Sequence, residues 1–183
     1  MSNNARAILL FIVMLCAAGC AEKPASSSPK QEPPLASEQQ LANVRRDAES
    51  LSQAFLKKDF GRAVDLTYPL IVAELGGREK MIALISRPKG IELKGMKLGT
   101  PEGPVEAAGK WYVIYPYTMS AEVPGRRPLQ TQTFHIGVSS DGGRSWTFVD
   151  GAGVKQNPAG LKQVLPDFPA QLKLPEVKFD DGA

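Results

Sequence analysis

Apolar residues between positions 37 and 87 recur every three or four positions, which is the period of a helix with one buried side. The longest such run predicts a helix over residues 38–58. Its apolar stripe consists of Leu41, Val44, Ala48, Leu51 and Phe55. Ser37 followed by Gln40 is typical of a capping box at its start. The proline at position 69 and the glycines at 76–77 divide the rest into shorter helices, which we expect around residues 59–66, 69–75 and 78–87.

From Ile91 onward the period changes to two, as in strands with two different faces. We expect strands over residues 91–96, 110–119, 129–138 and 144–150, with turns at 108–109, 123–125 and 141–143. Helices followed by strands with short connections predict an α+β domain, in which N-terminal helices pack against a curved antiparallel sheet. The remaining apolar residues, spread among prolines from 161 to 174, are expected to fold over an end of the sheet.

The first twenty residues have the pattern of an export signal. An apolar run from about Ala7 follows Arg6, and it is too short for an ordinary membrane span. Its ending, Ala17-Ala18-Gly19-Cys20, resembles a bacterial lipobox. The resemblance implies that residues 1–19 are removed and that Cys20 carries fatty acyl chains such as palmitate. The alternative is a plain secretory signal in which Cys20 is incidental.

The chain is therefore expected to have three parts: a lipoprotein signal peptide (1–19), the lipidated cysteine with a linker (20–36), and the α+β domain (37–183). The linker is rich in proline and serine and has few apolar side chains, so it cannot bury enough surface to offset the entropy of ordering. Ala21 follows the acylated cysteine where an aspartate would favour retention in the inner membrane. This resembles lipoproteins of the outer membrane that face the periplasm.

The amino-acid composition excludes several classes of function. The 22 basic and 19 acidic residues give a net charge of +3, which is no signature of a nucleic-acid binder. Cys16 leaves with the signal and Cys20 is acylated, so the domain has no thiol for catalysis, disulfides or metal binding. His135 is the only histidine, which excludes multi-histidine metal sites. We expect neither a metal nor a cofactor.

Residues 139–146, Ser-Ser-Asp-Gly-Gly-Arg-Ser-Trp, fit the Asp-box pattern of sialidase-type propellers. Asp141 can accept backbone N–H groups across the turn, Gly142 and Gly143 allow positive φ, and Trp146 can pack beside them. A propeller needs several blades, and the chain has one copy. We therefore interpret the motif as a structural hairpin.

Five residues are candidates for a pocket or binding face: Asp65, Tyr112, Tyr115, Tyr117 and His135. The tyrosines and His135 lie on neighbouring predicted strands, and His135 titrates near neutral pH. Asp65 falls where a base could project from a helix into a cavity. The alternative is that the aromatic residues belong to the core, while Asp65 and His135 are solvated.

Several segments together resemble a group of uncharacterised bacterial exported proteins and lipoproteins with a nuclear-transport-factor-two-like fold, also called cystatin-like or SnoaL-like. The segments are residues 54–60, 64–69, 76–81 and 140–150. The resemblance implies a cone, in which a curved sheet wraps a long N-terminal helix. Isomerases of this fold place a carboxylate base and a tyrosine inside the cone, but no such pair aligns to particular positions here. Fold alone does not give function.

The sequence thus favours a lipid-anchored envelope protein that binds a protein partner or a small apolar ligand with its concave sheet face, without catalysis. Two alternatives stay open. One is a lyase or isomerase with a pocket inside the cone, which requires a carboxylate facing a tyrosine. The other is a purely structural lipoprotein.

Overall fold

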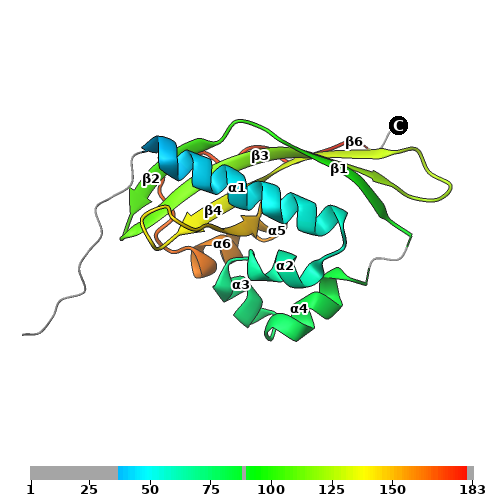
Figure 1. Ribbon diagram of the computed structural model, residues 1–183, viewed down its shortest axis with the longest axis horizontal. Coiled ribbons are helices and arrows are strands. Elements are labelled where there is room, and N and C mark those ends of the chain that lie inside the picture. Colours follow the sequence, from blue (N-terminus) through cyan, green and yellow to red (C-terminus); the bar gives the residue numbers. More distant parts are fainter. Residues whose placement is uncertain (1–36, 88–89, 181–183) are drawn as a thin grey trace, which may run out of the picture. The chain divides into compact units, whose positions relative to one another are not determined.

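The long helix expected from the apolar stripe is α1, Ser37–Leu56, in a computed structural model that describes residues 37–87 and 90–180. Its stripe is buried, with Val44 and Ala48 fully covered and Leu51 3% exposed. These side chains pack on one face of the sheet against Val113, Tyr115 and Phe148, among others. Figure 1 shows α1 lying along the sheet.

The shorter helices follow the boundaries expected from the sequence: α2 Phe60–Asp65, α3 Pro69–Glu74 and α4 Arg78–Ile85. The Asp59 carboxylate caps α2 by accepting the Arg62 backbone N–H. Pro69 occupies the start of α3, where its missing N–H costs nothing. Helix α3 buries none of its residues and α4 buries only Met81, so this pair presents apolar side chains at the surface.

The sheet is antiparallel, curved and unclosed, which confirms the expected α+β class. Its strands are β1 Glu92–Leu98, β2 Glu102–Ala107, β3 Lys110–Glu122, β4 Leu129–Ser139, β5 Thr147–Asp150 and β6 Lys178–Asp180. The long β3–β4 hairpin forms the centre. Strands β1 and β2 share the outer edge of β3, and β5 and β6 share the outer edge of β4.

The C-terminal segment differs from the expectation. It forms α5 Gly151–Gln156 and α6 Pro158–Val164, and β6 then joins the sheet. Instead of covering an end of the sheet, it packs over the face opposite α1. There Leu165 (1% exposed) and Val164 join Ile114 and Ile136 in a second core cluster. The sheet is thus covered on both faces, by α1 on one and by the C-terminal segment on the other.

Candidate functional site

The sheet separates the candidate tyrosines. Because side chains alternate along a strand, Tyr115 and Tyr117 point to the side of α1, whereas Tyr112 points to the C-terminal segment. Tyr112 contacts the edge of the Phe168 ring at a centroid distance of 5.9 Å, and burial raises its pKa. Tyr115 is 1% exposed within the α1 core. The two residues are core aromatics on different faces of the sheet.

Asp65 lies at the surface, at the end of α2. Its carboxylate accepts from the Arg78 guanidinium at 2.8 Å and 3.3 Å, and this hydrogen-bonded cation lowers its pKa. The ion pair joins α2 to α4. The structure therefore does not bring Asp65 together with Tyr112 or Tyr115.

His135, Tyr117 and Asp150 do come together. The His135 and Tyr117 rings stack with centroids 4.2 Å apart, and the Tyr117 hydroxyl donates to Asp150 Oδ1 at 3.1 Å. His135 and Asp150 are paired across β4 and β5. Asp150 Oδ2 also accepts the Gly153 backbone N–H and so caps α5. One carboxylate thus fixes both the tyrosine and the corner where β5 turns into α5.

Burial controls the protonation of this group. It lowers the pKa of His135 from 6.5 to about 4, an effect that the nearby Asp150 charge only partly opposes. Burial also raises the pKa of Tyr117, and the hydrogen bond to Asp150 acts in the same direction. Both ring nitrogens of His135 and the hydroxyl of Thr133 are buried without a hydrogen-bond partner among the described residues. At neutral pH His135 is therefore uncharged and enclosed.

The Asp-box residues form a tight hairpin between β4 and β5. Asp141 accepts the backbone N–H groups of Arg144 and Ser145, both at 3.0 Å, and the hydroxyl of Ser145 at 2.6 Å. Burial opposes the ionisation of Asp141, but these donors outweigh it and lower its pKa. Gly142 and Gly143 have φ of 76° and 87°, values that disfavour other residues. Trp146 is 1% exposed and donates to the Gly143 carbonyl.

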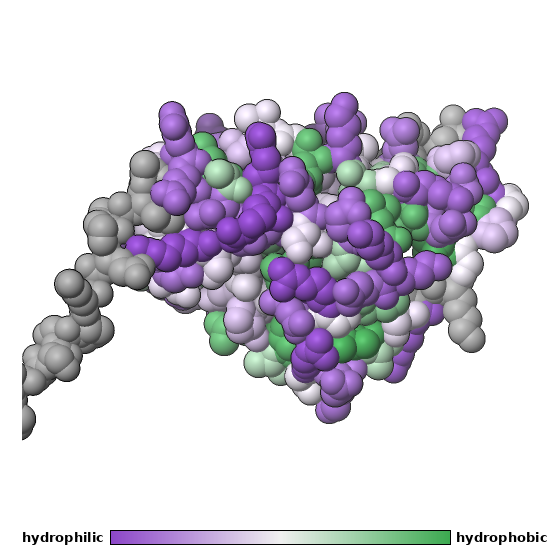
Figure 2. All heavy atoms as spheres, viewed as in Figure 1, coloured by the Kyte–Doolittle hydropathy of each residue, from purple (hydrophilic) through white to green (hydrophobic). Residues whose placement is uncertain are grey.

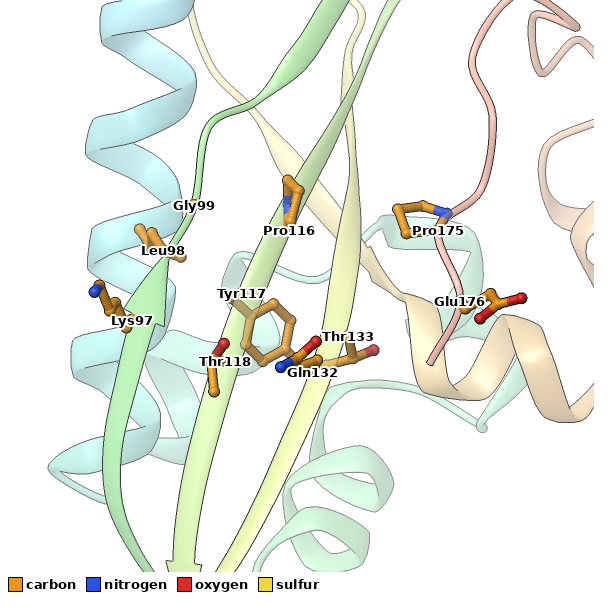
Figure 3. Close-up of a pocket in the computed structure, with 10 residues that line it drawn as sticks. All are labelled: Lys97, Leu98, Gly99, Pro116, Tyr117, Thr118, Gln132, Thr133, Pro175 and Glu176. Carbon is orange, nitrogen blue, oxygen red and sulfur yellow. The ribbon is translucent and has the colours of Figure 1, made fainter. Parts of the chain in front are cut away.

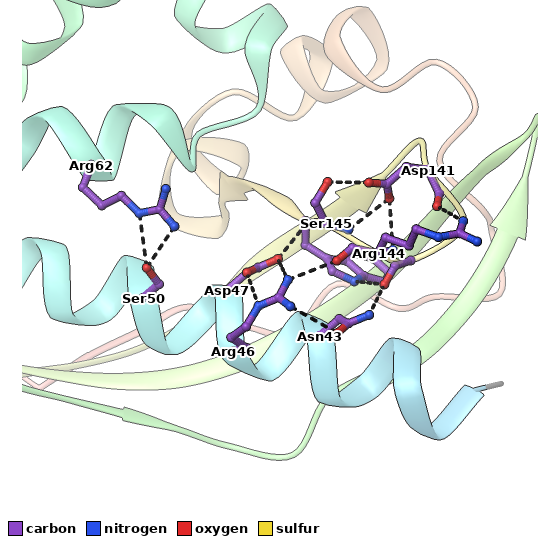
Figure 4. A network of polar contacts seen from close by, with 10 residues as sticks. Asn43, Arg46, Asp47, Ser50, Arg62, Asp141, Arg144 and Ser145 are labelled. Carbon is purple, nitrogen blue, oxygen red and sulfur yellow. Dashed lines mark hydrogen bonds and ion pairs between the residues drawn. The ribbon is translucent and has the colours of Figure 1, made fainter. Parts of the chain in front are cut away.

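Polar residues of α1 hold this hairpin in place (Figure 4). Asn43 donates to the Gly143 carbonyl, Arg46 donates to the Arg144 carbonyl, and Asp47 accepts the Trp146 backbone N–H at 3.0 Å. Asp47 is itself paired with Arg46 at 2.9 Å. These contacts are internal to the domain, so the hairpin has a structural role.

A shallow hollow of about 290 Å³ lies where β1, β3, β4 and the C-terminal segment meet (Figure 3). Tyr117 and Pro116 lie between Lys97 on one side and Glu176 on the other. Its lining mixes apolar, polar and oppositely charged side chains. The hollow therefore has no dominant chemistry that would define a ligand.

A second cleft, of about 220 Å³, has a clearer character. It lies between α3, the end of β5, α5 and α6. Its apolar lining consists of Ile71, Val149, Val154, Leu161 and Val164. Two acidic residues, Glu74 and Asp150, complete the lining together with Asn157, Gly153 and Gly160. This cleft, which we call the α3–α6 cleft, is an apolar depression with acidic groups.

Exposed leucines are found on α3 and α4. Leu70 and Leu75, next in sequence to the cleft residues Ile71 and Glu74, are 48% and 41% exposed, and Leu84 on α4 is 45% exposed. Leu70 also lines a separate depression, together with Lys110. Leu75 follows Ile71 by four positions, so both lie on the same side of the helix. Figure 2 shows hydrophobic residues interspersed with hydrophilic ones in the lower part of the molecule, where α3 and α4 lie. The cleft, with Leu70 and Leu75 at the ends of the helix that forms one of its walls, is the best candidate binding surface.

This cleft could hardly be predicted from the sequence, because its walls come from three separate segments, 71–74, 149–154 and 157–164. The one available signal was α3 itself, Pro-Leu-Ile-Val-Ala-Glu-Leu, where apolar residues occupy more positions than one buried side requires.

No family model, curated protein or solved structure matches the chain. Within residues 37–87 and 90–180, no cluster of three or more histidine, cysteine or carboxylate side chains is arranged to hold a metal ion. No helix in the same part of the chain has the length and apolar character needed to cross a membrane. Cys20 lies outside the described residues.

Proposed function

We propose that this chain is a lipid-anchored protein of the bacterial cell envelope, held at the outer membrane and facing the periplasm, and that its domain binds a protein partner without catalysing a reaction. The lipobox-like ending at Cys20 supports the anchor. The observation that carries the binding role is the α3–α6 cleft, together with exposed Leu70 and Leu75 at the two ends of α3, the helix that forms one of its walls. Exposed apolar groups next to a depression are typical of interaction sites.

This proposal moves the binding site away from the concave face of the sheet. Both faces of the sheet are already covered, by α1 on one side and by the C-terminal segment on the other. A partner would have to displace one of them to reach the sheet. The α3–α6 cleft is open at the surface and needs no such rearrangement. The nuclear-transport-factor-two-like resemblance is compatible with a helix against a curved sheet, and it remains part of the proposal.

A lyase or isomerase is the second candidate, because Asp150 meets Tyr117 at 3.1 Å and also lines the cleft. The geometry favours a positioning role instead. Both Asp150 oxygens already accept hydrogen bonds, from Tyr117 and from the α5 backbone. His135 has no atom at the surface of the cleft, and its lowered pKa makes it a weak base.

Photocrosslinking in the producing cell tests the partner. A benzophenone amino acid at Leu70 or Leu75 should give a discrete crosslinked product, and mass spectrometry should identify the same protein from both positions. Leu161→Asp, inside the cleft, should abolish the product while circular dichroism shows an unchanged fold. Glu106, exposed on β2, is the matched control position and should give none. The absence of a product, or a product insensitive to Leu161→Asp, would reject the proposed site.

A further inference from the structure

The acidic groups of the α3–α6 cleft have no cationic partner. Neither Glu74 nor Asp150 forms an ion pair with a described residue, although Arg46, Arg78 and Lys94 each pair with carboxylates elsewhere. Lys155 and Lys162 are on α5 and α6, the helices that form the cleft, each one residue beyond a lining residue, but neither lines the cleft itself. The ionisable side chains among the lining residues are therefore both acidic, in a chain whose net charge is +3.

The apolar part of the cleft sets the size of what can enter. Its volume of about 220 Å³ lies below the range of roughly 300–1,000 Å³ that holds drug-sized ligands. Its floor belongs to the core, since Val149, Val154 and Val164 are at most 7% exposed. A rigid floor with an apolar wall suits one large side chain, such as leucine or phenylalanine, inserted from a partner.

We propose that the α3–α6 cleft recognises a protein segment in which a large apolar side chain is flanked by lysine or arginine. The apolar side chain would fill the cleft, and its basic neighbours would lie against Glu74 and Asp150. This inference rests on the proposed binding function and specifies its partner. Charge complementarity of this kind contributes mainly to specificity and to the rate of association.

The same charges argue against the membrane as the occupant of the cleft. Anionic headgroups attract basic surfaces, and Glu74 and Asp150 would repel them. A lipid surface is also flat on this scale, whereas the apolar lining is recessed. A protruding apolar side chain with a basic neighbour fits both the recessed shape of the cleft and the charge of its acidic residues.

Three capped peptides with the same leucine–phenylalanine core test the proposal, flanked by lysines, by serines or by glutamates. They are titrated by ¹H–¹⁵N NMR into the full chain carrying Cys20→Ser, so that no acyl chain competes. We expect shifts at Val154 and Leu161, with the lysine peptide binding about tenfold more tightly than the glutamate peptide and the serine peptide between them. The difference should shrink as salt is added.

The variant Glu74→Gln/Asp150→Asn should bring the three affinities within about twofold of each other. Asparagine retains an oxygen that can cap α5, so the fold should persist. Glu106→Gln removes a carboxylate outside the cleft and should change nothing. Equal binding of all three peptides to the parent chain would overturn the charge preference alone.

If no peptide shifts the cleft residues, the proposed binding site itself fails. Vesicles of phosphatidylethanolamine and phosphatidylglycerol test whether the surface binds lipid instead of a protein segment. Flotation of the Cys20→Ser chain with these vesicles, lost in Leu70→Ser/Leu75→Ser, would assign the surface to lipid and overturn the inference.

Discussion

His135 is the residue whose environment is least typical of its type. A histidine at the surface would titrate near pH 6.5, but this ring is 3% exposed, stacked on Tyr117, and without a partner for either nitrogen. Its pKa of about 4 means that the folded protein resists the proton that the unfolded chain accepts. Stability from this group is complete above pH 6.5 and declines as the pH falls toward 4.

His135→Phe should remove that dependence. Between pH 6.5 and 4.5 the parent chain should lose about 2 kcal/mol of unfolding free energy through this group, and the variant should lose much less. At pH 7 the variant should be equally or more stable, because phenylalanine keeps the stack on Tyr117 and removes two unpartnered nitrogens. Urea unfolding at a series of pH values measures both. Parallel stability curves for the two proteins would contradict the assignment.

Among the elements, α1 does more than cover the sheet, because its polar side holds the β4–β5 hairpin. Asp47→Ala should cost about 1–3 kcal/mol, since it leaves the buried Trp146 N–H without an acceptor. Asp47→Asn keeps an oxygen at that position and should cost less. Glu49→Ala, exposed on the same helix, is the control and should stay within about 0.5 kcal/mol. Urea midpoints give the comparison, and an Asp47→Ala effect no larger than the control would refute the role.

Helices and strands with a regular spacing of apolar residues could be predicted from the sequence. Elements that depend on glycine, proline or capping residues could not. The stripe of α1 and the alternation of β3 and β4 predicted where these elements lie in the chain, because burial selects apolar residues at a fixed spacing. Strand β2 was missed because Gly103 and Pro104 interrupt its pattern between two glutamates. Helices α5 and α6 were missed because both begin with poor helix formers, and capping by Asp150 and Asn157 decides where they start.

The candidate site was harder to predict than the fold, since it depends on how distant segments meet. Tyr117 and His135 lie on neighbouring strands, as expected, but their ring stacking depends on the register of β3 and β4. Asp150 joins Tyr117 and His135 only because β5 pairs with β4 in this register, which the sequence does not show. Asp65 is held away from these residues by Arg78 of α4, a contact that also depends on the folded structure. The α3–α6 cleft depends on α5 and α6, which the period did not reveal.

On the scale of the whole molecule, the C-terminal segment completes the domain by covering the second face of the sheet. Leu165→Ala should cost about 2–5 kcal/mol, because Leu165 is 1% exposed against Ile114, Ile136 and their neighbours. Lys162→Ala, exposed on α6, should have little effect. Thermal and urea unfolding measure the difference. A negligible change for Leu165→Ala would mean that the segment lies on the sheet without stabilising it.

The other whole-molecule expectation concerns the anchor, because a cleft that faces the periplasm functions only where the chain is retained. Cys20→Ser should move the protein from the membrane fraction to the soluble fraction, since stable retention requires the acyl chains. Cys16→Ser is the matched control, because a cysteine inside the signal has no part in acylation, and it should leave the protein membrane-bound. Intact mass should show the parent chain starting at Cys20 with acyl groups attached. An unmodified Cys20 in the parent chain would refute the anchor, while the binding tests at the α3–α6 cleft would keep their meaning.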